Sequence, residues 1–123
     1  MKAGVKCVLT RDGEVLLVRH TYADRCRWEL PGGGIKRGER PIDAARRETR
    51  EELGVDVRDW TPLGDLFERV HGKHDHLWCF TAELDRRALE LDRAEIAEAR
   101  WFAPGRLPPH TAKHVGRIAA MRS

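Results

Sequence analysis

GGIKRGERPIDAARRETREELGV, residues 33–55, is the stretch that decides the fold of this chain. A glycine-rich turn leads into a segment whose side chains, placed about 100° apart, divide into three sectors around a helix. One sector is apolar and one is solvated. The third carries three carboxylates, from Glu48, Glu51 and Glu52. We predict an amphipathic helix that starts at Pro41 and ends before Gly54, because proline suits a first helical position and glycine the position past the end.

The carboxylate sector is unfavourable for an isolated helix. Glu48 lies three residues before Glu51 and four before Glu52, and each like-charge pair costs roughly 0.2–0.5 kcal/mol. Glu51 and Glu52 also lie in the last turn, where the helix dipole disfavours an anion by roughly 0.3–1 kcal/mol. Arg47 can pair with Glu51 but cannot neutralise all three. A bound divalent cation is the simplest compensation, and oxygen ligands without His or Cys favour Mg²⁺ or Mn²⁺.

The turn before this helix is rich in glycine, with Gly32, Gly33, Gly34 and Gly38 following Pro31. Such a backbone can adopt positive φ angles and approach a ligand closely. Its exposed peptide N–H groups can also meet phosphate oxygens. Metal-binding carboxylates beside a phosphate-accommodating turn indicate phosphoryl or pyrophosphoryl chemistry.

The spacing of these residues resembles the complete Nudix box. The matching pattern is Gly33, five residues, Glu39, seven residues, Arg47-Glu48-Thr49, one residue, Glu51-Glu52, one residue, and Gly54-Val55. The flanks also resemble the family, at Trp28 to Pro31, at Ala44-Ala45 and from Glu95-Ile96 through Trp101-Phe102. Two positions depart from the family pattern. Thr49 stands where an aliphatic residue is usual, and Arg40 stands where a Ser or Thr cap is common.

The resemblance implies roles for the residues of the box. Glu48, Glu51 and Glu52 would be metal ligands, Arg47 would orient the carboxylates, and Glu39 would hold Arg47 or assist at the site. Gly33 and Gly54 would shape the turns. Nudix relatives often recruit a further carboxylate as metal ligand or general base, and Glu95 and Glu98 are the candidates, with salt-bridged surface acids as the alternative. The candidate catalytic residues are therefore Glu39, Arg47, Glu51, Glu52, Glu95 and Glu98.

Substrate-binding candidates surround the glycine turn. The polar loop 20–27 joins a predicted core strand to the segment that begins at Trp28, and this brings nearby basic and aromatic side chains toward the expected pocket. The candidates are Gly33, Gly34, Arg19, Tyr22, Arg25, Arg27 and Trp28. The alternative is that the polar ones are ordinary surface side chains and that Trp28 packs in the core.

The rest of the chain predicts a layered domain. Expected strands cover residues 5–10, 15–19, 55–58, 63–70 and 77–82, with an edge strand toward the end of 95–102. An Asp12-Gly13 turn joins the first two strands in a hairpin. A last helix follows Thr111 as its cap. This pattern predicts an α/β or α+β fold. The Nudix resemblance implies an α/β/α sandwich, with a mixed β-sheet between the box helix and the C-terminal helix.

Length and charge limit the function classes. A chain of 123 residues is most simply one domain, here a single Nudix hydrolase domain over residues 1–123. The net charge of +3 is mild, and the basic residues are interleaved with acids, so we expect no nucleic-acid partner. No segment is long and apolar enough to span a membrane, and no signal peptide is evident, so a soluble cytoplasmic protein is expected.

The expected function is Mg²⁺-dependent hydrolysis of a diphosphate linkage in a nucleoside diphosphate derivative or a nucleoside triphosphate. The partner would be a small nucleotide-type substrate, and a homodimer is compatible with this interpretation. The alternative is a catalytically silent Nudix-fold module that binds or senses a nucleotide. Such a module would be expected to lose box carboxylates or to carry an added domain, and this chain does neither.

Overall fold

The computed structural model describes residues 2–22, 25–70, 73–85 and 88–122. The strands are β1 (Lys2–Arg11), β2 (Glu14–His20), β3 (Gly32–Gly34), β4 (Thr61–Val70), β5 (Lys73–Glu83) and β6 (Ile96–Phe102). The helices are α1 (Pro41–Leu53) and α2 (Lys113–Ala120). The strand order is β4-β5-β1-β2-β6, with β3 paired to β1 outside this path. The sheet is mixed, because β1 runs parallel to β5 and antiparallel to β2 and β3.

The predicted hairpin joins β1 to β2. Thr10 pairs with Val15, and the two turn residues adopt left-handed angles, with φ 53° at Asp12 and 78° at Gly13. Positive φ at both central residues is the conformation that a two-residue turn needs to match the twist of its strands. This prediction from the Asp-Gly pair is confirmed.

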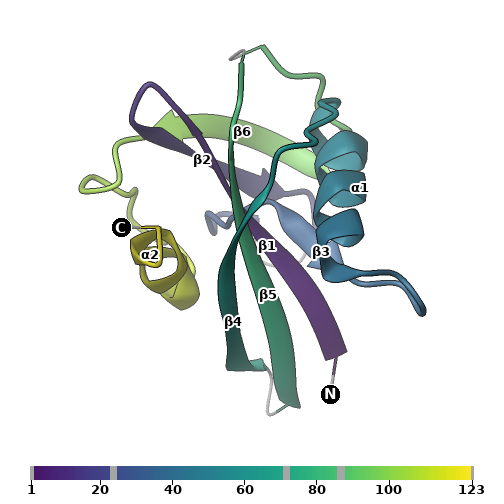
Figure 1. Cartoon of the computed structure of the whole chain (residues 1–123). Helices are drawn as coiled ribbons and strands as arrows, with labels where there is room; N and C mark the ends of the chain where they lie inside the picture. Colours follow the sequence, from purple (N-terminus) through teal and green to yellow (C-terminus); the bar gives the residue numbers. More distant parts are fainter. Residues whose placement is uncertain (1, 23–24, 71–72, 86–87, 123) are drawn as a thin grey trace.

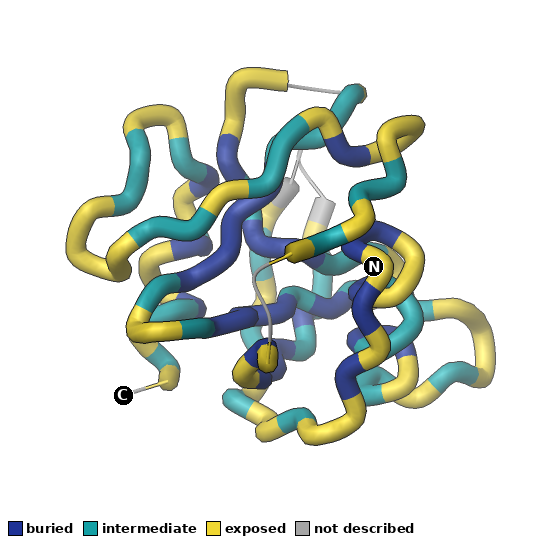
Figure 2. The backbone as a smooth tube through the Cα atoms, turned by 90° about the horizontal axis from the view of Figure 1, so that it is seen from above, coloured by how far each residue is buried: buried dark blue, intermediate teal, exposed yellow. Residues whose placement is uncertain are grey.

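The two helices cover opposite faces of the sheet (Figure 1). Alternate residues of β1 serve the two faces: Cys7 packs in a cluster with Ala45 of α1, and Val8 packs in a second cluster with Ile118 of α2. This alternation follows from the two-residue period of a strand. Buried backbone accordingly runs through the middle of the molecule, with exposed loops around it (Figure 2). The predicted α/β/α arrangement with a mixed sheet is confirmed.

The box helix has the predicted ends. Pro41 is its first residue, and Gly54 follows it with a left-handed φ of 70°, donating its backbone N–H to the Arg50 carbonyl. Arg40 makes no side-chain cap hydrogen bond to the helix and instead pairs with Asp43. The start of the helix thus depends on proline and on an acid in the first turn rather than on a hydroxyl cap.

Three local predictions were wrong. Residues 32–34 form a strand rather than a turn alone, because they find backbone partners at residues 4–6 of β1. Residues 55–58 form no strand: Val55 and Val57 are buried against the core, but no neighbouring strand pairs with this segment in the described chain. Thr111 does not cap α2. Ala112 occupies that position, and the Thr111 hydroxyl donates to the Pro108 carbonyl.

The remaining strands contain the predicted residues, but β5 begins at Lys73, where a turn was expected before the 77–82 strand. β4 includes the expected residues 63–70, starts earlier at Thr61, and has an irregular register between Pro62 and Gly64. β5 is an interior strand, and β6 is an edge strand paired only with β2 in the described sheet. In the described portions of the chain, no helix has the length and hydropathy required to cross a membrane.

Candidate functional site

Arg47 organises the carboxylates of the box. Its guanidinium donates two hydrogen bonds to Glu39, of 2.8 and 2.9 Å, and one of 2.9 Å to Glu48 Oε1. A longer contact of 3.3 Å reaches Glu51 Oε2, and Nη2 also donates to the Gly34 carbonyl at 2.9 Å. Hydrogen bonding to Arg47 and to the Lys36 backbone N–H lowers the pKa of Glu39 to about 2. The structure therefore joins Glu39, Glu48 and Glu51 through the single guanidinium group of Arg47.

Glu48 lies directly behind the glycine strand β3. A Cβ atom on Gly33 would be only 2.6 Å from Glu48 Cδ, so this position accommodates the carboxylate because it has no side chain. Burial and the negative charge of Glu52 raise the pKa of Glu48. The Glu48 anion is thus incompletely compensated, although Arg47 lowers part of the penalty.

Glu52 is the most buried member of the site, with a relative exposure of 1%. Its Oε1 accepts a hydrogen bond of 3.1 Å from the Gly32 backbone N–H. Its Oε2 lies 3.6 Å from Nε2 of His20, at the end of β2. A buried carboxylate with so few donors is costly unless further positive charge is supplied.

The carboxylate cluster, defined here as Glu48, Glu51 and Glu52, suits a divalent cation in ligand type and charge. All its donors are oxygens, and two of the three acids are held beside each other with a charge penalty on Glu48. Among the described residues, no three His, Cys, Asp or Glu side chains converge tightly enough to make a finished metal cage. Glu51 is half exposed and is held only by Arg47 in the contacts that the structure shows.

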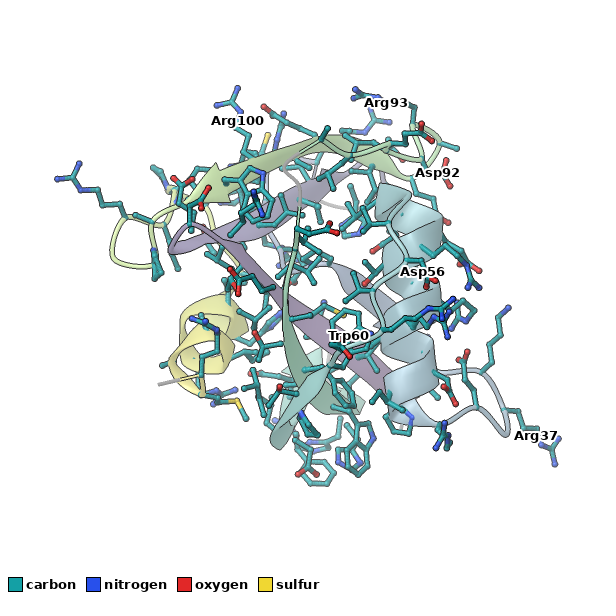
Figure 3. All side chains as sticks on the ribbon, turned by 45° about the horizontal axis from the view of Figure 1, so that its top comes forward. Arg37, Asp56, Trp60, Asp92, Arg93 and Arg100 are labelled. Carbon is teal, nitrogen blue, oxygen red and sulfur yellow. The ribbon has the colours of Figure 1, made fainter. Side chains whose placement is uncertain are left out.

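The two further acids predicted for the site lie in different places. Glu95 follows a loop at the carboxyl end of α1, where the Asp92 backbone N–H donates to the Glu52 carbonyl; Figure 3 shows Asp92 and Arg93 at this end of the helix. Glu95 is exposed and contributes to the negative field at Tyr22. The structure therefore places Glu95 on the loop before β6, which is hydrogen-bonded through Asp92 to the carboxyl end of α1.

Glu98 does not join the cluster. Both its carboxylate oxygens form ion pairs, one with Arg19 and the other with Arg100. Burial alone would raise the pKa of Glu98, but these two guanidinium groups lower it. In Figure 3 Arg100 projects from β6 away from α1. This geometry agrees with the alternative interpretation, in which Glu98 is a salt-bridged surface acid.

Arg19 and Trp28 are likewise on the α2 side of the sheet. The Arg19 guanidinium carbon lies 5.2 Å from the Trp28 ring centroid. Trp28 is 9% exposed and packs edge-on against Phe102, with ring centroids 5.1 Å apart. The structure places Trp28 in the core and brings neither residue to the carboxylates.

A cavity of about 570 Å³ lies on the other side of β3 from the carboxylate cluster. It is bounded by the beginning of β1, by β3, by parts of β4 and β5 and by the start of α2. We call it the groove. Three of the predicted substrate-binding residues line it, namely Arg27, Gly33 and Gly34. Gly33 therefore contacts both regions, with the groove on one side and Glu48 on the other.

The groove contains a charged network that the sequence analysis missed. Glu29 Oε1 lies 2.7 Å from His114 Nε2 and 3.5 Å from Lys6 Nζ, and it accepts the Leu30 backbone N–H at 2.8 Å. Burial would raise the pKa of Glu29, but Lys6 and His114 overcome this and lower it to about 2. The groove thus presents an ionised carboxylate beside two donors, which is an arrangement able to orient a polar ligand group.

His20 was also missed, although strand alternation contains a signal for it. Leu16 and Val18 point to the α1 face, and the same two-residue period places His20 on that face beside Glu52. Lys6 could have been assigned to the opposite face by the same argument, since it alternates with Val5 and Cys7. His114 had no such signal, because its position depends on how α2 docks.

Comparison with known proteins identifies similar chains. A family model described as NUDIX domain matches residues 1–121. The RNA pyrophosphohydrolase of Bartonella clarridgeiae is 44% identical over 116 residues, covering 76% of this chain and 67% of that protein. The putative 8-oxo-dGTP diphosphatase of Bacillus subtilis is 33% identical over 101 residues, covering 82% of this chain and 65% of that protein. The match to a third relative, the RNA pyrophosphohydrolase of Bartonella bacilliformis, covers only 39% of that protein's length.

A solved structure supports the fold. The MutT NUDIX hydrolase from Burkholderia pseudomallei superposes with a TM-score of 0.86 at 24% sequence identity, over 99% of this chain and 98% of that one. At this level of identity the likeness concerns the arrangement of strands and helices.

Proposed function

Since this chain belongs to the NUDIX domain family, we propose that it hydrolyses a phosphoanhydride bond in a nucleoside diphosphate derivative or a nucleoside triphosphate. The observation that carries the proposal is the Arg47 fork, which fixes Glu39, Glu48 and Glu51 beside buried Glu52. Relatives named for pyrophosphohydrolase and diphosphatase activities support the same bond type. In the reaction, water adds across the bridging P–O–P bond and gives two phosphate-terminated products.

Glu48, Glu51 and Glu52 would hold Mg²⁺ or Mn²⁺. When bound, such a cation neutralises charge on phosphate oxygens and lowers the pKa of a coordinated water. The chain's own contribution is positioning. Arg47 keeps Glu48 and Glu51 on one side of the helix, and the Gly32 backbone N–H fixes the Glu52 carboxylate.

A nearby carboxylate would accept the proton from the attacking water. Glu51 and Glu52 lie in the cluster itself, and exposed Glu95 lies on the loop that is hydrogen-bonded to the carboxyl end of α1. The ion pairs of Glu98 with Arg19 and Arg100 make it the weakest of the four candidates. We assign the base to one of Glu51, Glu52 and Glu95.

The substrate would lie across β3. Gly33 separates the groove from Glu48, so a polyphosphate crossing this strand could reach the carboxylates while its nucleoside occupies the groove. Lys6, Glu29 and His114 then supply the polar contacts for that nucleoside. We include cytoplasmic location and a small nucleotide-type partner in the same proposal.

The test is a substrate panel with the purified protein. ADP-ribose, a nucleotide sugar, the common nucleoside triphosphates and 8-oxo-dGTP are incubated with Mg²⁺ or Mn²⁺, and phosphate, pyrophosphate and nucleoside monophosphate are quantified. We expect turnover that stops when the cation is chelated. Binding of these ligands without any product would contradict the proposal and favour the silent nucleotide-binding module.

A further inference from the structure

A second cavity, of about 350 Å³, lies between α2, the β1–β2 hairpin and the segment that joins β6 to α2. Figure 1 shows this joining segment and α2 on the side of the sheet opposite α1. Among the described residues, the second cavity shares no lining residue with the groove. The first residues of α2 border the groove, whereas Gly116 and later residues border the second cavity. The second cavity is therefore separate from the region proposed for the substrate.

The walls of the second cavity are aliphatic. Val8 and Val15, each 1% exposed, come from the two strands of the hairpin, and Leu107 comes from the joining segment. No aromatic side chain lines the second cavity in the part of the chain that the structure describes, so it offers no ring on which a nucleotide base could stack. Its volume falls in the range of about 300–1,000 Å³ that is typical of small-molecule sites. The walls thus suit a saturated hydrocarbon chain.

The helix side of the second cavity is built from small residues. Gly116, Ala119 and Ala120 line it and, at i, i+3 and i+4 spacing, share one face of α2. A Cβ atom on Gly116 would meet no heavy atom within 4 Å, so packing inside the chain does not require a glycine there. Glycine is also less favourable than alanine inside a helix. Its effect at this position is to widen the second cavity.

Thr10 brings an unused hydrogen-bonding group to the second cavity. This residue lines the second cavity and is 7% exposed. Its backbone carbonyl accepts the Leu84 backbone N–H at 2.9 Å, but none of the described residues hydrogen-bonds its hydroxyl. The hydroxyl is not sealed in, because the one enclosed side-chain polar atom without a partner in the described chain is Nε of Arg11. Since nearly buried hydroxyls are normally bonded, the Thr10 hydroxyl is available to a ligand.

Arg122 gives the second cavity a positive charge. It carries the only charged side chain among the described lining residues, and its guanidinium forms no ion pair in the described chain. Its backbone N–H donates to the Ala119 carbonyl at 3.3 Å, which holds the residue against the end of α2. A cation without a neighbouring acid favours a ligand with a negative charge.

We propose that the second cavity binds a medium-chain fatty carboxylate. The alkyl chain lies against the aliphatic walls, and the carboxylate accepts a hydrogen bond from the Thr10 hydroxyl and pairs with Arg122. The proposed ligand has one charge and no ring, which matches a site with one guanidinium group and no aromatic wall. No residue of the carboxylate cluster or of the groove takes part, so the inference does not depend on the proposed function.

The first test is calorimetric titration with hexanoate, octanoate and decanoate. Each additional buried methylene should raise the affinity about fourfold until the second cavity is full. Arg122→Gln should weaken decanoate binding about two- to fivefold, because the ion pair is partly exposed. The control is Arg50→Gln, an exposed arginine on α1 across the sheet, which should leave binding unchanged. An affinity that is independent of chain length, or equal losses in the two variants, would overturn the inference.

Thr10→Val separates a role in binding from a role in folding. It keeps the shape of the side chain and removes a hydroxyl that has no partner in the described chain, so Tm should stay equal or rise. Decanoate affinity should nevertheless fall about two- to tenfold, because the ligand loses a hydrogen bond. Unchanged affinity in this variant would contradict the role of Thr10.

Gly116→Leu tests the location by filling the second cavity. The new side chain starts in open space, so the variant should fold with an equal or higher Tm and bind decanoate more than tenfold more weakly. Gly116→Ala adds only a methyl group and should reduce affinity less than threefold. Amide chemical shifts of the native protein should change at residues 116–120 on addition of decanoate. Shifts confined to the groove, or full affinity in Gly116→Leu, would overturn the proposal.

Sedimentation velocity distinguishes the fatty carboxylate from a second copy of the chain as the occupant. The ligand-free native protein and Gly116→Leu should sediment alike at every concentration. A dimer of the native protein that is lost in Gly116→Leu would show that another copy covers the second cavity, and would overturn the proposal.

Discussion

The carboxylate cluster and the groove lie on either side of β3, yet the chain builds them in opposite ways. The cluster comes from one helix, with Glu48, Glu51 and Glu52 inside five consecutive residues. The groove draws on strands β1, β3, β4 and β5 and on the start of α2, and its Glu29–His114 contact joins residues 85 positions apart. The first region depends on helix periodicity, whereas the second depends on how distant elements pack.

The largest effect is expected at the cluster. Glu52→Gln retains an acceptor for the Gly32 backbone N–H but removes the charge, so folding should be nearly unchanged while kcat falls about 100- to 10,000-fold. The comparison is Glu98→Gln, an acid held by arginines on the other face, which should change kcat by less than about twofold. Similar losses in both variants, at equal Tm, would contradict the placement of the reaction on α1.

Divalent cations should stabilise the cluster specifically. Because the cation binds the folded chain, Tm should rise with Mg²⁺ or Mn²⁺ concentration, corresponding to roughly 2.7 kcal/mol at 100 times Kd. Differential scanning calorimetry measures this shift, with NaCl at matched ionic strength as the control. Glu48→Gln should weaken the response, because it removes one of the proposed oxygen ligands. A native Tm that is indifferent to both cations would count against a metal site.

Glu29 in the groove should contribute to the loss of stability in acid. Glu29 has its pKa lowered to about 2, so its ion pairs stabilise the folded state fully above its unfolded pKa of about 4.5. This contribution is lost as pH falls from about 4.5 toward 2. Glu29→Gln should therefore lower the free energy of unfolding at pH 7 by roughly 1–3 kcal/mol. In urea titrations, the same substitution should also flatten the dependence of the unfolding free energy on pH between about 2 and 4.5. An unaltered acid limb would show that Lys6 and His114 do not hold Glu29 ionised in solution.

The boundary between the regions is tested by a pair of glycines. A methyl group at Gly33 would displace the Glu48 carboxylate, whereas one at Gly34 would meet open space. We expect Gly33→Ala to lower kcat/KM about tenfold, since even a small displacement of a catalytic group is expensive. Gly34→Ala should lower it much less. Equal kinetics in the two variants would mean that Glu48 moves aside without consequence.

Sequence reasoning recovered the cluster because its evidence is local. Pro41 and Gly54 marked the helix ends, and residue spacing placed Arg47 near Glu51. The role of the cluster as a metal site stays a prediction. The helix pattern put Arg47 on the solvated side, whereas its side chain is directed toward Glu39 and Gly34. This could not be predicted from the helix, because both partners come from the preceding loop and strand.

Two of the three errors concern whether a segment finds a partner strand. Residues 32–34 have the low strand preference of glycine, yet β1 supplies hydrogen-bond partners and makes them a strand. Val55 and Val57 alternate as a strand would, but their burial against the core needs no partner strand. The groove was missed for a related reason. Its residues carry no common period, and only docking of α2 brings His114 to Glu29.

The single glycine between the carboxylate cluster and the groove affects how the two regions can change during evolution. The walls of the groove that come from α2, β4 and β5 contribute no member of the carboxylate cluster. After a gene duplication, those walls can accumulate substitutions that admit a new nucleoside while α1 retains its acids. Under the proposed function, this partition would let one carboxylate cluster act on substrates with different nucleosides, provided that position 33 stays without a side chain.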